Sequence, residues 1–467
     1  MSPIKVPPPA RPGDPNPNPN GDGGPPIHGR DLGNAELKRL LWRAGFGPRP
    51  GDVDALAGKP LTDVVYSLTR PQGTATLTGP EPHDEDGALA PFDAWGHDHL
   101  WWLDRMVRSD QQLVERMTLV WHDWFATSND SVGSAKLMID QNETFRAGAL
   151  GSFKDLLTAV TKDPAMLVWL NGIENRRRAV NENYARELME LFTLGADRGA
   201  YSERDVREQA RALTGWRNSW DDDLGPVRFR YDKRRHDAGS KRIFGKRGHF
   251  DWHDSCRLCV HHRLHPSFFV TKLWSYFVPV PPRPGTKRAL QHLYVRSGYQ
   301  VRPVVEAILR HPALYNGPRM VKPPAVYIAG LLRGLGRGVD TEAWTWLMSL
   351  AGQQLFYPPN VAGWDDTRWL DTATFRARWE IAGYAIRPRV LKENAKHVPH
   401  RADKLVERAR ALLGEPTLTG PTEAALMRFA KRSLADADAE WKKRQYPPLI
   451  ENALRQLLAT APDLQTS

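Results

Sequence analysis

Apolar residues recur at helical spacing in one segment after another of this 467-residue chain. In the stretch ERMTLVWHDWFATSN, four apolar side chains follow at i, i+3, i+4 and i+7: Met117, Val120, Trp121 and Trp124. That spacing places them on one buried face of a helix. The same periodicity predicts helices over 137–150, 152–160, 164–170, 181–194, 202–214, 254–277, 286–297, 301–310, 322–335 and 341–351. We therefore expect a mainly α fold, a large multi-helix globular body.

Two segments depart from this helical pattern. Residues 226–250 alternate apolar and polar side chains around a glycine-containing turn, which predicts one small β-hairpin insertion. In FYPPNVAGW, residues 356–364, paired prolines followed by glycine predict a rigid loop.

The length and the N-terminus suggest how the chain is organised. Residues 1–30 are rich in Pro, Gly and Asn, with almost nothing to bury, and are predicted to be a disordered tail. Residues 31–467 are predicted to form a single helical domain, with 31–220 and 251–467 as candidate sub-lobes because the chain exceeds the usual size of one core. The chain has only two cysteines, so no disulfide framework is expected.

Charge and hydropathy indicate the class of partner and the compartment. The formal net charge of +11 is compatible with an anionic partner, such as an anionic small molecule or a saccharide, although an Arg-rich composition alone also explains it. Dense Lys/Arg runs are missing from the sequence, so nucleic acid is not expected. No apolar run is long enough to predict a membrane span, and the N-terminus has no apolar region typical of a signal peptide. The predicted location is cytoplasmic.

Several long motifs occur in a typical order: LLWRAGFGPRPGDVDAL, ERMTLVWHDWFATSN, NENYARELMELFTLG, YSERDVREQARALTGW, HDAGSKRIFG, MVKPPAVYIAGLLRGLG and LFYPPNVAGWDDTRWLDTATFRAR. In these motifs the chain resembles the bacterial DUF1800 family, a domain of unknown function, over residues 33–465. The resemblance implies no established reaction. Members are often exported and encoded beside a sulfatase-like family, so the resemblance implies a sulfatase-like partner protein. We expect this chain to depart from that pattern, because its N-terminus predicts no export signal.

Histidines and carboxylates in three of these motifs are the candidate metal ligands: His122, Glu187, Glu190 and His236. Glu187 and Glu190 are spaced i, i+3, so both carboxylates can approach one point. Imidazole and carboxylate are ligand types that zinc, iron and manganese accept. We therefore predict a divalent metal ion, with His122, Glu187, His236 and Asp237 as catalytic residues.

Each of these residues also has a structural interpretation. Aromatic neighbours make His122 equally consistent with a core histidine, and Asp123 is a weaker candidate because adjacent helical residues point about 100° apart. The carboxylates of Glu187 and Glu190 could instead pair with Arg207 or Arg211 in a buried salt-bridge core.

Substrate-binding candidates are taken from the same motifs: Trp124, Arg207, Lys241, Lys322, Asn360 and Trp364. Lys322 lies at the start of a predicted helix, where an anion can bind the free N–H groups. Asn360 and Trp364 lie in the predicted rigid loop and could form a pocket wall, although tight turns that dock helices are the simpler interpretation.

Three functions follow from these residues. The first is a metal-dependent hydrolase with a His/Glu site in a Trp-lined cleft, in which the metal ion activates water. The second is an oxidoreductase that uses the same ligands. The third is a non-enzymatic binding or assembly protein whose polar motifs form the salt-bridge core.

Overall fold

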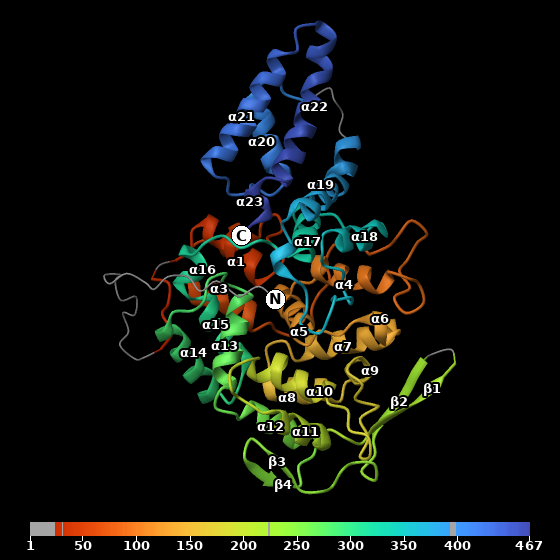
Figure 1. Cartoon of the computed structure of the whole chain (residues 1–467). Coiled ribbons are helices and arrows are strands. Elements are labelled where there is room, and N and C mark those ends of the chain that lie inside the picture. The colour runs from red at the N-terminus through yellow and green to blue at the C-terminus, as the bar shows by residue number, and fades with distance from the viewer. Residues whose placement is uncertain (1–23, 30, 223–224, 393–397) are drawn as a thin grey trace.

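The computed structural model describes residues 24–29, 31–222, 225–392 and 398–467, and its mainly helical architecture confirms the predicted fold class (Figure 1). Most of the predicted tail, residues 1–30, lies outside the described residues. None of the helices in these ranges is long and apolar enough to cross a membrane.

The first third of the chain forms nine helices within the described residues. These are α1 (Asn34–Ala44), α2 (Asp52–Leu56), α3 (Leu61–Thr69), α4 (His97–Arg108), α5 (Gln112–Trp124), α6 (Asn129–Val132), α7 (Ala135–Ala147), α8 (Phe153–Thr161) and α9 (Pro164–Trp169). The face of α5 that carries Met117, Val120, Trp121 and Trp124 is fully buried, as its spacing predicts.

The middle of the chain completes the main body. It contains α10 (Asn183–Glu187), the π-helix η1 (Leu188–Leu194), α11 (Glu203–Ala212), α12 (Trp252–Val260), α13 (His265–Ser275), α14 (Pro284–Arg296), α15 (Val301–Leu309) and α16 (Pro312–Asn316). One apolar cluster runs from Leu32 to Tyr315, so residues on both sides of the strand region share a core.

The last third adds a second core and a projecting bundle. Its elements are α17 (Pro324–Leu335), α18 (Ala343–Leu350), the 3-10 turn η2 (Asp366–Arg368), α19 (Thr372–Lys392), α20 (Ala402–Leu412), α21 (Gly420–Ala435), α22 (Glu440–Ala459) and α23 (Pro462–Gln465). Helices α20, α21 and α22 form a bundle with its own apolar cluster, and this bundle stands at the end of the molecule opposite the strands (Figure 1).

The predicted hairpin at 226–250 is instead two antiparallel pairs. Strand β1 (Trp216–Asp221) pairs with β2 (Gly225–Tyr231), and β3 (Lys241–Ile243) pairs with β4 (Lys246–Gly248). The second pair turns at Phe244 and Gly245, both with positive φ, the conformation favoured in two-residue hairpins. β1 precedes the predicted segment, and its polar sequence gave no strand signal.

Two predicted helices differ from the structure. The segment 254–277 breaks into α12 and α13, because Pro266 occupies the first turn of α13 and cannot continue a preceding helix. The segment 181–194 changes from α to π geometry after Glu187. The Thr193 hydroxyl donates to the Leu188 carbonyl, five residues earlier, within this wider turn. Such π turns are frequent at functional sites.

Candidate functional site

His122 lies in the core of the protein and not in a cleft. Its side chain is fully buried, and neither ring nitrogen has a hydrogen-bond partner in the described residues. Four aromatic rings surround it at centroid distances of 5.1 to 6.0 Å: Trp102, Phe145, Phe356 and Trp364. Burial lowers the pKa of His122 to about 3. His122 is therefore a neutral core histidine at physiological pH.

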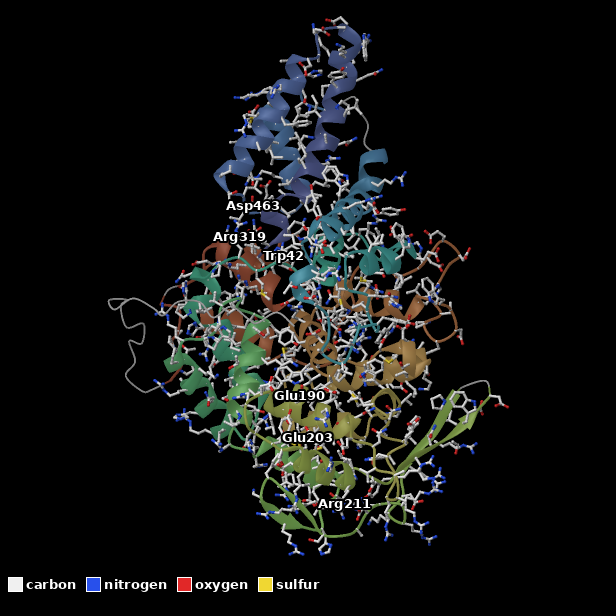
Figure 2. All side chains as sticks on the ribbon, viewed as in Figure 1. Trp42, Glu190, Glu203, Arg211, Arg319 and Asp463 are labelled. Atoms are coloured by element: carbon white, nitrogen blue, oxygen red, sulfur yellow. The ribbon has the colours of Figure 1, made fainter. Side chains whose placement is uncertain are left out.

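Glu187 and Glu190 lie next to each other at the start of the π-helix. Burial, followed by repulsion from Glu190, raises the pKa of Glu187. The Tyr201 hydroxyl donates to Glu190 at 3.2 Å. Within the described residues, neither carboxylate pairs with Arg207 or Arg211. Figure 2 shows Glu190 well separated from Trp42, which lies near the bundle.

The arginines pair with other carboxylates of the same region. Arg207 lies 3.5 Å from Glu182, which also pairs with Arg186 at 3.4 Å, as the i, i+4 spacing predicts. The capping box of Ser202 and Asp205 is present at the start of α11. Arg207 is exposed and takes part in a surface ion-pair network, which gives it a structural role.

The strand region holds His236, Asp237 and Lys241 in structural contacts. His236 Nδ1 lies 3.0 Å from the Thr214 carbonyl oxygen. Arg211 donates to Asp237 at 2.8 Å. Lys241 donates to the main-chain oxygens of Asp237 and Gly239. These bonds pin the ribbon to the end of α11.

The four predicted metal ligands are not brought together. No three His, Cys, Asp or Glu side chains in the described part of the chain gather as ligands for a metal ion. His122 is enclosed by aromatic rings, and His236 is held at the end of α11. The described residues show no assembled ligand set for zinc, iron or manganese, and binding of such a metal stays a prediction.

Asp123, the neighbour of His122, takes part in a polar site instead. Because adjacent helical residues diverge by about 100°, Asp123 leaves the core when His122 enters it. Its Oδ2 accepts from the Tyr276 hydroxyl at 2.6 Å, and its Oδ1 accepts from the Trp364 N–H at 2.9 Å. Burial raises the pKa of Asp123. The predicted residue Trp364 therefore contributes its main chain to this site, while its ring packs on His122.

The loop that reaches Asp123 depends on Gly363. This glycine has φ +92°, and a Cβ there would lie 2.3 Å from Asp123 Oδ1. Asn360 Oδ1 accepts from the Ala362 N–H at 2.8 Å and shapes the same turn. The rigid loop is confirmed as a turn that docks on α5, and Asn360 stabilises it.

We expect Gly363→Ala to weaken folding more than Gly352→Ala. Both glycines have positive φ, so both alanines carry conformational strain, but the nearest atom to a Cβ at Gly352 is 3.7 Å away. The alanine at 363 must also push the loop from Asp123, which adds about 1–3 kcal/mol. Urea unfolding of both variants measures the difference, and equal losses would show that the loop does not require this close approach.

Lys272 of helix α13 lies close enough to Asp123 for its charge to oppose the rise in the pKa of Asp123. Its ammonium donates to the Leu191 carbonyl near the end of η1 at 3.2 Å and lies 4.6 Å from the Trp124 ring centroid. Burial lowers the pKa of Lys272 to about 8. Trp124 is itself fully buried, and its indole N–H donates to the Phe192 carbonyl. Trp124, which was predicted to bind substrate, therefore contacts the Lys272 ammonium through its ring and is covered by other side chains.

Arg116 lies seven residues before Asp123, on the same face of α5. Its side chain is only 4% exposed, yet the described residues offer it no hydrogen bond and no ion pair, and its Nε is fully buried. Burial lowers its pKa to about 10, and Tyr276 and Asp123 lie close enough to oppose that shift. A nearly buried guanidinium without a partner is unusual in proteins.

Together these residues define the Asp123 cluster: Arg116, Asp123, Lys272 and Tyr276. Asp123, Lys272 and Tyr276 are half-buried, so the cluster is accessible to solvent. Asp366 lies at its exposed edge and further raises the pKa of Asp123 by repulsion. Sequence reasoning missed three of the four members. The available signals were the seven-residue spacing from Arg116 to Asp123 and the i, i+4 pair of Lys272 and Tyr276 within an apolar helix.

Comparison with known protein families assigns the chain to one of them. A family model described as a protein of unknown function (DUF1800) matches residues 39–466. The chain belongs to the DUF1800 family. No curated protein and no solved structure matches it. Membership in the DUF1800 family therefore confirms the resemblance seen in the sequence motifs, but it does not identify a reaction.

In this DUF1800 chain, Lys322 lies apart from the Asp123 cluster. It directly precedes Pro323, the N-cap of α17, and its ammonium donates to the Leu464 carbonyl at 2.7 Å. Its side chain is buried and lines a cavity near the bundle. Lys322, which was predicted to bind an anion, therefore lies at a different place in the fold from the Asp123 cluster.

Proposed function

We propose that this DUF1800 protein is a hydrolase that binds its substrate through a carboxylate, phosphate or sulfate group at the Asp123 cluster. The observation that carries the proposal is the guanidinium of Arg116, which is nearly buried and has no partner in the described residues. Planar guanidinium groups bind such oxyanions through two parallel hydrogen bonds. A substrate oxyanion would supply the missing partner.

Lys272 provides the second positive charge of the proposed site. Its ammonium is held by the Leu191 carbonyl and by the ring of Trp124, which leaves donors for a ligand. The depressed pKa of Lys272, about 8, reflects burial, and an anion beside it would favour the charged form. Arg116 and Lys272 would bind from α5 and α13, on two sides of Asp123.

Asp123 is the proposed general base. In hydrolysis, a water molecule adds across the bond that breaks, and the base takes a proton from the water and returns it to the leaving group. Burial raises the pKa of Asp123, which strengthens it as a base. The Tyr276 hydroxyl and the Trp364 N–H each donate one hydrogen bond to a different oxygen of the Asp123 carboxylate. Each oxygen therefore keeps a lone pair that can accept a further hydrogen bond or a proton.

The proposal uses neither His122 nor the predicted metal ion. His122 faces aromatic rings, and the four predicted ligands do not form one ligand set in the described residues. No observation in the described residues favours the oxidoreductase over the hydrolase. In the non-enzymatic alternative, the chain binds the same oxyanion at the Asp123 cluster, but Asp123 does not act as a general base.

We expect Asp123→Asn to lower kcat by about 10²- to 10⁴-fold, the usual contribution of a positioned general base. The assay uses aryl phosphates, aryl sulfates and carboxylate-bearing aryl esters, because each releases a coloured phenol. Asp140→Asn is the matched control, since Asp140 is half-exposed and pairs with Lys136 on the surface of α7. Thermal unfolding of both variants checks that the fold is retained.

Two results would reject the catalytic role of Asp123. One is a folded Asp123→Asn variant with unchanged kcat. The other is a wild-type chain that binds these compounds and hydrolyses none of them, which would favour the non-enzymatic function.

A further inference from the structure

A cavity of about 280 Å³ lies between the main body and the bundle. Its floor is formed by α1 and α17, the α23 segment closes one side, and residues Leu413–Thr417, between α20 and α21, reach over it. Figure 2 shows Trp42, Arg319 and Asp463 of its lining together at the base of the bundle. No member of the Asp123 cluster lines this cavity.

Positive charge exceeds negative charge in the lining. The cationic side chains are Lys38, Arg39, Arg319 and Lys322, and the side-chain carboxylates are Glu36 and Asp463. The main-chain carboxylate of Ser467 also lines the cavity and accepts from Arg43. Arg319 and Asp463 form an ion pair at 2.5 Å, so they neutralise each other. The lining thus suits an anion.

Three of these cations contact main-chain oxygens and no carboxylate within the described residues. Lys38 donates to the Glu415 carbonyl. Arg39 donates to the Tyr315 and Gly317 carbonyls. Lys322, only 3% exposed, donates to the Leu464 carbonyl. The charges of Lys38 and Arg39 are therefore not offset by a contacting carboxylate. Burial lowers the pKa of Lys322 well below its usual range, and an anion beside it would favour its charged form.

Trp42 makes one wall of the cavity flat and apolar. The Lys322 ammonium lies 3.5 Å from its ring centroid. The indole fits tightly against Gly330 of α17, where a Cβ would lie 2.1 Å from the Trp42 ring. Tyr315 and Tyr327 add further aromatic lining, and both donate their hydroxyls to main-chain oxygens elsewhere. The rings are therefore packed firmly beside the cations.

We infer that this cavity is a second ligand site, which binds a small oxyanion joined to an aromatic or apolar group. Lys322, with Arg39 beside it in the lining, would bind the oxyanion, and Trp42 would contact the flat part. Because the lining comes from both the body and the 413–417 segment, a bound ligand would contact the body and the bundle together. The inference stands independently of the proposed function at the Asp123 cluster.

Calorimetric titration of the full chain with phenyl phosphate and with inorganic phosphate tests this site. Two variants remove it in different ways. Lys322→Met deletes the buried charge, and Gly334→Leu fills the cavity from α17, where a Cβ meets no atom within 4 Å. Gly285→Leu is the matched control, since Gly285 is a helical glycine with equal space and lies outside the lining.

We expect phenyl phosphate to bind more tightly than inorganic phosphate at this site. Lys322→Met and Gly334→Leu should each weaken phenyl phosphate binding by at least about tenfold, the usual effect of losing a charged contact. Gly285→Leu should leave it unchanged, and the same pattern should hold in the Arg116→Met background, where the Asp123 cluster has lost its proposed anion contact. Since Gly334→Leu removes no native contact, it keeps the test valid if Lys322→Met folds poorly.

Three outcomes would overturn the inference. The first is the absence of phenyl phosphate binding by the wild-type chain at millimolar concentration. The second is phenyl phosphate binding that survives Gly334→Leu in the Arg116→Met background, where the Asp123 cluster has lost its proposed anion contact. The third is binding that is lost in Arg116→Met and retained in Gly334→Leu, which would assign the ligand to the Asp123 cluster.

Discussion

An Arg116→Met variant is expected to fold more stably than the wild-type chain while losing oxyanion binding at the Asp123 cluster. The guanidinium is nearly buried and unpartnered in the described residues, so its removal relieves a desolvation cost of about 1–3 kcal/mol. Its loss should weaken inorganic phosphate binding by about 10- to 100-fold, because charged hydrogen bonds disappear. Urea unfolding and calorimetric titration measure the two effects.

The titration is best done in the Gly334→Leu background, which fills the cavity near the bundle and leaves the Asp123 cluster as the measured site. Arg186→Met is the control, since Arg186 pairs with Glu203 on the surface. If Arg116 instead stabilised the fold, the Arg116→Met substitution would destabilise the chain. If Arg116→Met unfolds at lower urea concentration than the wild-type chain, Arg116 is held by the fold and the proposed substrate contact is wrong.

Stability is expected to fall steeply as the pH decreases from 6.5 towards 4. Burial lowers the pKa of His122 to about 3 and the pKa values of His265 and His311 to about 4. In the unfolded chain these histidines take up protons near pH 6.5, while the folded chain keeps them neutral. Protons therefore bind preferentially to the unfolded state, and the free energy of unfolding decreases by roughly several kcal/mol.

His122→Leu should reduce this pH dependence. The substitution keeps a similar volume and removes two unpaired ring nitrogens, so the variant should stay within about 1.5 kcal/mol of the wild-type chain at pH 7.5. Between pH 6 and 4, the slope of unfolding free energy against pH should fall by about 1.4 kcal/mol per pH unit, the equivalent of one proton. An unchanged slope would mean that His122 is not a neutral core residue.

The sequence predicted the helical fold because apolar periodicity is a local signal. It did not predict the π-helix, since that geometry rests on Thr193 and on Lys272 from a distant helix. The break before α13 could have been read from Pro266. The strand β1 carries mostly polar residues and forms only by pairing with β2, so its pattern alone gave no indication.

The candidate site was predicted in part. The motifs WHDWFATSN and YPPNVAGW do meet, but through Asp123 and the Trp364 main chain and not through His122. Buried residues occupy most faces of α5, so the spacing did not decide which of His122 and Asp123 enters the core. Arg116, Lys272 and Tyr276 were missed because an isolated arginine, lysine or tyrosine in a helix carries no motif. Their meaning depends on side chains from two elements far apart in the sequence, such as Tyr276 and Asp123, which sequence spacing does not bring together.

The most direct test of the Asp123 cluster as an oxyanion site is a crystal structure of the chain grown with tungstate, which mimics phosphate and sulfate and is located by its anomalous scattering. We expect an anomalous peak in hydrogen-bond contact with the Arg116 guanidinium and close to the Lys272 ammonium. The same crystals of Arg116→Met should lack that peak. A map with no peak at Arg116, or a structure in which Arg116 forms an ion pair with a protein carboxylate, would contradict the proposal.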